Sequence, residues 1–236
     1  MSGFFSHMRR GAIANLPVAA SVAAYGSVLG VLAAQKQISW AVLLLMNLTI
    51  FAGSAQFVMV DMWMPALPIL EIILAAAVIN LRYLLIGASL NPVFQGSSLT
   101  QKSLIMHFVA DENWAVTMAA NRSGLATPAF LLGGGICLAT VWSCGTLAGH
   151  RLGAVIDDPA VFALDFAFFA VFIALAVSLW RGKKDVLPWF VAALASILAE
   201  NFLPGKWYIA IGGISGALSS VWVPRFKKKG ITNETT

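Results

Sequence analysis

The feature that most constrains this chain is a succession of apolar blocks, each about 16 to 25 residues long. A helix needs about 20 such residues to cross the roughly 30 Å hydrocarbon core of a bilayer. Hydrophobic residues make up 59% of the 236 residues and charged residues 11%, whereas a soluble domain carries about 25% charged residues. Because a soluble core cannot absorb so many apolar side chains, the sequence predicts an all-α polytopic membrane protein.

The apolar blocks predict a transmembrane bundle of about seven or eight spans, some of them discontinuous. Tryptophans near the ends of several blocks support the boundaries, because amphipathic rings favour the headgroup region. The fourth block is polar at its centre and is the least certain to cross. The predicted spans run approximately over 16–34, 39–60, 65–90, 103–121, 129–148, 160–180, 187–202 and 206–223.

Three basic clusters indicate the orientation of the spans: Arg9 with Arg10, 181–184 and 225–229. Lys and Arg are enriched in cytoplasmic loops, so all three clusters and both termini are expected in the cytoplasm. This placement requires an even number of crossings between each pair of clusters. Eight spans satisfy it if the fourth segment crosses, whereas a fourth segment that enters and returns leaves seven spans and one cluster outside.

The formal net charge of +5 does not indicate nucleic-acid binding, because the basic residues lie between apolar blocks or at the chain ends. The sequence contains no P-loop, no H-E-x-x-H and no G-x-S-x-G motif. Cys137 and Cys144 would be about 10 Å apart on one helix and therefore cannot bridge each other. We expect neither an enzyme nor a cofactor.

A short match indicates an internal duplication. Residues 26–30 resemble residues 145–149, and each segment precedes a polar loop and a long apolar block. The whole chain is therefore predicted to be one transmembrane domain with related halves at about 12–100 and 127–223, separated by the polar segment 103–121. The match is also short enough to have arisen by chance.

The same two glycine segments and residues 212–216 have G-x-x-x-G spacing. This spacing lets helix backbones approach closely in lipid. Packing inside the monomer is the preferred interpretation, and a dimer interface is the alternative.

Ionisable groups inside predicted spans are the strongest functional signal, because a central charge costs roughly 2.5–3.5 kcal/mol on insertion scales. Asp111 and Glu112 lie at the centre of the fourth segment, which must therefore face a water-filled cavity or polar partners. His107 precedes Asp111 by about one helical turn, which permits a proton relay on one helical face. No second His or Cys lies at ligand spacing, so no metal site is expected.

The third predicted span carries Glu71, Asn80 and Arg82. Glu71 is close enough to the start of the span to snorkel and is a second candidate for proton relay. Arg82 lies deeper and about 16 Å from Glu71, so it needs another partner. Asp111 or Glu112 is the predicted partner. The pair either fixes helix packing or serves as a gate or substrate site, and the functional interpretation is preferred.

The second predicted span is interrupted by small and polar residues that include Gly53, Ser54 and Gln56. A break here would expose backbone N–H and C=O groups at membrane depth, where half-helix ends can hold a carboxylate or an ammonium group. A continuous, closely packed helix with Gln56 hydrogen-bonded across it is an equally good interpretation.

Three motifs together resemble the AzlC family, the large subunits of bacterial branched-chain amino acid exporters: FAGSAQF at 51–57, NLRYLLIGASL at 80–90 and FVADENWA at 108–115. The resemblance implies export of valine, leucine or isoleucine across the bacterial inner membrane, driven by the proton gradient. It also implies a small AzlD-like partner of about four spans. Where many members of the family read Asn-x-Arg-His, this chain has Tyr83, which weakens a proton role at that position.

The hypothesis is therefore a secondary exporter. Its candidate substrate or ion pathway comprises Gly53, Ser54, Gln56, Asn80, Arg82, Asp111 and Glu112, with His107 and Glu71 as candidate proton relays. A membrane scaffold or assembly protein without flux is the alternative, motivated by the G-x-x-x-G segments. An intramembrane hydrolase would rest only on the scattered carboxylates.

Overall fold

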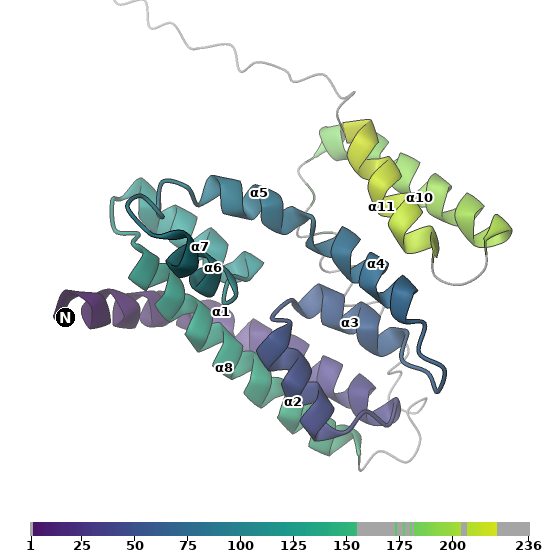
Figure 1. The fold of residues 1–236 in the computed structure, drawn as a ribbon, viewed down its shortest axis with the longest axis horizontal. Coiled ribbons are helices and arrows are strands. Elements are labelled where there is room, and N and C mark those ends of the chain that lie inside the picture. The colour runs from purple at the N-terminus through teal and green to yellow at the C-terminus, as the bar shows by residue number, and fades with distance from the viewer. Residues whose placement is uncertain are drawn as a thin grey trace, which may run out of the picture. The chain divides into compact units, whose positions relative to one another are not determined.

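The computed structural model describes residues 2–154, 173, 177, 180, 182–203 and 207–220. It forms two compact units, Met1–Val177 and Ser178–Thr236. All secondary structure in the described residues is helical (Figure 1). The predicted span at 160–180 lies largely outside the described residues, as does the basic cluster at 225–229.

Two long helices, α1 (Ser2–Gln35) and α8 (Pro128–Gly153), form the frame of the first unit. They lie side by side along most of their lengths (Figure 1). Gly11 near the start of α1 contacts Phe130 near the start of α8, and Val31 near the end of α1 contacts Gly153 at the end of α8. The two helices therefore run in the same direction.

Glycines allow the backbones of α1 and α8 to touch. A Cβ atom added to Gly30 would collide with the carbonyl of Thr146, and one added to Gly149 would collide with the carbonyl of Ser27. The two G-x-x-x-G segments that resemble each other in sequence thus pack against each other within one chain. This confirms the preferred interpretation of packing inside the monomer.

The second predicted span is broken into two short helices. Helix α2 (Trp40–Thr49) ends at Ile50, and α3 (Gly53–Asp61) begins after Ala52. Ile50 and Ala52 have non-helical backbone angles, with φ of −131° and −146°. Of the two interpretations that the small and polar residues allowed, the break is therefore the one observed.

The chain reverses direction at this break. The ring Nε2 of His150, close to the end of α8, donates to the carbonyl of Ile38 just before α2, at 2.7 Å. Lys36, just after α1, donates to the carbonyl of Asp61 at the end of α3, at 3.0 Å. Helices α2 and α3 thus begin and end at the same end of the α1–α8 pair, and together they form a hairpin.

The third predicted span is confirmed as one long apolar segment, Ile69–Ser89. It consists of α4 (Ile69–Asn80) and α5 (Arg82–Ser89), with a kink at Leu81. The kink places Arg82 at the first position of α5.

The fourth segment is a second hairpin, of α6 (Leu99–Met106) and α7 (Asp111–Arg122). The loop before α6 lies beside the start of α8, because Val93 and Phe94 share an apolar cluster with Leu131. The five residues 123–127 after α7 lead directly into α8. The hairpin therefore occupies the opposite end of the α1–α8 pair from α2 and α3.

The prediction of seven or eight spans is consequently not confirmed, and the fourth segment is two short helices rather than one long helix. A hydropathy window cannot distinguish one span from two half-length helices that return. Within the described residues, four helical segments are long and apolar enough to cross a membrane: Gly3–Gln35, Ile69–Ser89, Pro128–Gly153 and Lys183–Phe202.

The hairpins make a prediction about sidedness. After the two native cysteines are replaced by serine, single cysteines at Gln37 and Met64 should be labelled by a membrane-impermeant maleimide from one side of the membrane. Cysteines at Gln95 and Ser123 should be labelled from the other side, because each pair flanks one hairpin. Labelling of Gln37 and Met64 from opposite sides would show that the second segment crosses.

The second unit contains α10 (Val186–Phe202) and α11 (Trp207–Ser220), which follow a 3-10 turn at Lys183–Asp185. The two helices pack closely because a Cβ atom on Gly212 would collide with the Ser196 hydroxyl. The G-x-x-x-G segment at 212–216 therefore also packs inside the chain.

Candidate functional site

Arg82 connects the two hairpins. Its Nη1 lies 2.6 Å from Oδ2 of Asp111, the first residue of α7. Its Nη2 donates to the hydroxyl of Ser54, the second residue of α3, at 2.8 Å. The predicted ion pair is therefore present, with Asp111 as the partner. We call these three residues the Arg82 junction.

The junction brings together the N-terminal ends of α3 and α7 and the kink at which α5 continues from α4. A helix N-terminus carries a partial positive charge of roughly +0.5 and N–H groups that have no partner within the helix. Ala52, which precedes α3, provides no side-chain cap, whereas Asp111 and Glu112 lie in the first turn of α7. The α3 side of the junction therefore favours an anion, and the α7 side favours a cation.

Hydrogen-bonding capacity remains at the junction. Nε of Arg82 and Oδ1 of Asn80 are buried without a hydrogen-bond partner in the described part of the chain. The guanidinium also lies over the ring of Tyr83, 5.4 Å from its centre, at a distance typical of a cation–π contact. The side chains of Arg82 and Asp111 are 27% and 33% exposed. A small polar molecule can therefore reach both of them.

His107 connects the tips of the two hairpins. Its ring Nε2 lies 2.9 Å from the carbonyl oxygen of Leu48, close to the end of α2. The expectation that His107 and Asp111 share one helical face is wrong, because the chain leaves the helix between them. The side chain of Asn113 holds this turn by accepting from the backbone N–H of Ala110 at 2.7 Å.

The other two predicted carboxylates are placed differently. Glu112 lies beside Asp111 in the first turn of α7, and the described residues contain no ion pair to it. Glu71 lies in the first turn of α4, about 16 Å along the helix from Arg82. The structure therefore brings Glu112 to the junction and leaves Glu71 near the end of its span.

Gln56 lies in a buried polar network. Its Nε2 donates to Oδ1 of Asn47 at 3.0 Å, and its Oε1 accepts from the indole N–H of Trp142 at 2.8 Å. Asn47 in turn donates to the hydroxyl of Thr146 at 2.7 Å. A Cβ atom on Gly53 would lie 3.0 Å from the Trp142 ring. Gln56 and Gly53 thus fasten the α2–α3 hairpin to α8.

Sequence reasoning did not identify Asn47, Trp142 and Thr146 as partners of Gln56. The available signal was Trp142, a tryptophan near the middle of an apolar block, away from either interface. A buried indole N–H usually requires an acceptor, and Gln56 provides it.

Replacing Gln56 with leucine should destabilise the protein by about 1–3 kcal/mol, because Trp142 and Asn47 would each lose a buried partner. Thermal unfolding in detergent would measure the effect, with Gln95→Leu on an exposed loop as the control. An unchanged unfolding temperature would show that the network contributes little.

Comparisons with known proteins agree with a membrane location. A family model described as "AzlC protein" matches residues 17–156, more than half of the chain. An "Uncharacterized membrane protein" of Archaeoglobus fulgidus is 25% identical over 218 residues, covering 91% of this chain and 94% of the relative. Another from Helicobacter pylori J99 is 23% identical over 179 residues, covering 75% and 78%. No solved structure matches.

Proposed function

This chain belongs to the AzlC family, and from that premise we propose that it is the large subunit of a secondary exporter of hydrophobic amino acids. The family and the membrane-protein relatives indicate a role in membrane transport, and the family is not an enzyme family. The proposed substrates are valine, leucine and isoleucine, moved out of the cell by the proton gradient. The proposed partner is a small AzlD-like subunit of about four spans.

The observation that carries the proposal is the Arg82 junction, where one guanidinium bridges Ser54 and Asp111 at the meeting point of two broken helices. Intramembrane charge is costly and is typical of transport pathways. A substrate carboxylate would bind to Arg82 and the unpaired N–H groups at the start of α3. The substrate ammonium would bind to Asp111 and Glu112.

This binding mode also provides a gate. When the pathway is empty, Arg82 pairs with Asp111 and holds the two hairpins together. A substrate carboxylate would compete with Asp111 for the guanidinium and weaken the link between the hairpins. Substrate binding would thus be coupled to separation of α3 from α7.

The charge distribution supports a cytoplasmic location for the end of the frame where α8 begins. The end where α8 begins carries three arginines: Arg9, Arg10 and Arg122. The end where α8 finishes carries two basic residues, Lys36 and Arg151. Because cytoplasmic loops are enriched in Lys and Arg, we place the N-terminus on the cytoplasmic side of the inner membrane. The sequence prediction of a span at 160–180 agrees with this proposal, because a fourth crossing would return the cluster at 181–184 to the cytoplasm.

The alternative, a scaffold without flux, was based on the three G-x-x-x-G segments, and the structure no longer supports that argument. All three G-x-x-x-G segments pack inside the chain, in the α1–α8 pair and in the α10–α11 pair. They therefore do not present free glycine surfaces for an assembly partner.

The test is transport in inside-out vesicles that contain this chain and the small partner. Radiolabelled leucine, isoleucine and valine should accumulate when a proton gradient is imposed, and accumulation should stop when the gradient is collapsed. Lysine and glutamate serve as charged controls. If no hydrophobic amino acid accumulates above empty vesicles, the proposal fails.

A further inference from the structure

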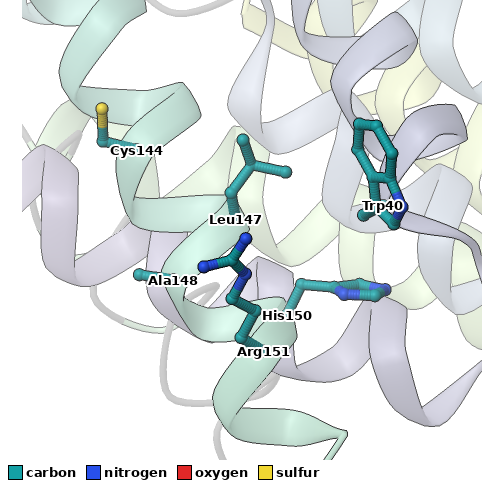
Figure 2. Close-up of a pocket in the computed structure, with 6 residues that line it drawn as sticks. All are labelled: Trp40, Cys144, Leu147, Ala148, His150 and Arg151. Carbon is teal, nitrogen blue, oxygen red and sulfur yellow. The ribbon is translucent and has the colours of Figure 1, made fainter.

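A groove lies on α8 beside the start of α2, outside the Arg82 junction (Figure 2). Its volume is about 510 Å³, within the range of about 300–1,000 Å³ typical of small-molecule sites. Its lining combines two basic side chains with apolar and small ones: Trp40, Cys144, Leu147, Ala148, His150 and Arg151.

The pattern of residues on α8 explains the groove. Cys144, Leu147, Ala148 and Arg151 follow an i, i+3, i+4, i+7 spacing and therefore form one stripe along the helix. Cys144 and Ala148 are small and leave room in this stripe. The hydrogen bond from His150 to the carbonyl of Ile38 holds the start of α2 beside it.

The groove is amphipathic along its length. Arg151 lies in the last turn of α8, and Trp40 is the first residue of α2, so both lie at the end of the frame. Leu147, Ala148 and Cys144 continue from there toward the middle of α8 (Figure 2). The polar end of the groove therefore lies at the end of α8, and its apolar part extends toward the middle of this apolar helix.

Arg151 is available for an anion. Its side chain is exposed, and no carboxylate forms an ion pair with it in the described part of the chain. The C-terminal end of a helix carries a partial negative charge, so an anion here would be held by the guanidinium alone. Guanidinium groups bind phosphate through two parallel hydrogen bonds.

We propose that this groove binds an anionic glycerophospholipid, with its phosphate on Arg151 and one acyl chain along Leu147, Ala148 and Cys144. A free inorganic anion would use Arg151 but leave the apolar stripe uncovered. A lipid would contact both parts of the groove. Its charged phosphate would lie on Arg151, and its apolar chain would lie along Leu147, Ala148 and Cys144.

The two native cysteines provide the test. In purified full-length protein, Cys137→Ser leaves Cys144 in the groove as the only thiol. Cys144→Ser leaves Cys137, which lies on the same face of α8 about 10 Å further from Arg151 and does not line the groove. The rate of maleimide labelling is measured with phosphatidylglycerol, phosphatidylcholine or inorganic phosphate added to the detergent. Phosphatidylglycerol should slow labelling of Cys144 about 5-fold or more and that of Cys137 less, with little effect of phosphatidylcholine.

Arg151→Gln should remove the difference between the two lipids, and Arg151→Lys should retain part of it. Arg122→Gln, an exposed arginine at the far end of the frame, should leave it unchanged. Equal protection of Cys144 by both lipids, or a preference that persists in Arg151→Gln, would overturn the proposal. Protection by inorganic phosphate equal to that by phosphatidylglycerol would also overturn it and indicate a free-anion site.

Discussion

Replacing Arg82 with alanine is expected to reduce amino acid flux by about 100-fold or more, which corresponds to roughly 2.7 kcal/mol. The change removes the contacts to Asp111 and Ser54 together and leaves Asp111 without its counter-ion. Because both charged side chains keep about a third of their exposure, the cost in folding should be smaller than the 3–5 kcal/mol of a fully buried pair. Flux per folded protein in inside-out vesicles measures the effect.

Three further variants define the role of the Arg82 junction. Asp111→Asn should be as inactive as Arg82→Ala, because the amide cannot neutralise the guanidinium. Arg82→Lys keeps the charge but not the two-pronged geometry, so intermediate flux is expected. Arg122→Ala, on the exposed last turn of α7, is the matched control and should transport normally. Normal flux in both Arg82→Ala and Asp111→Asn would exclude the ion pair from the mechanism.

Replacing Gly149 with leucine is expected to prevent folding of the first unit. Any Cβ atom at this position would collide with the backbone carbonyl of Ser27, and a backbone cannot move aside as a flexible side chain can. Separating α1 from α8 would remove the contacts along most of both helices. Overpacking in a core costs about 1–3 kcal/mol or more. The fraction of monodisperse protein in detergent size-exclusion chromatography measures the loss.

Gly87→Ala is the control for this prediction. Gly87 also lies in a helix, but an added Cβ atom would meet only the flexible end of Met106, at 3.7 Å. This variant should give as much folded protein as the parent. If Gly149→Leu folded equally well, the close approach of the two backbones would not be needed for stability.

Much of the Arg82 junction could be predicted from the chemistry of single residues. A deep arginine in an apolar segment requires a counter-ion, and the nearest carboxylates in the sequence at membrane depth were Asp111 and Glu112. The choice between these neighbours depended on which one the first turn of α7 directs toward α5. Gln56 was predicted as a pathway residue or as a packing residue, and the structure places both ends of its amide in a packing network.

The helical class, the lipid environment and the need for polar partners could be predicted, because they follow from the composition of each segment. The direction of the chain at Ile50–Ala52 and at 107–110 could not, because it depends on tertiary contacts. A crossing helix and a hairpin of two short helices bury similar numbers of apolar residues. The contacts that separate them join distant residues, such as Lys36 with Asp61 and His107 with Leu48. The apolar blocks therefore predicted the membrane, and long-range contacts determined which of them form long helices and which fold back as hairpins.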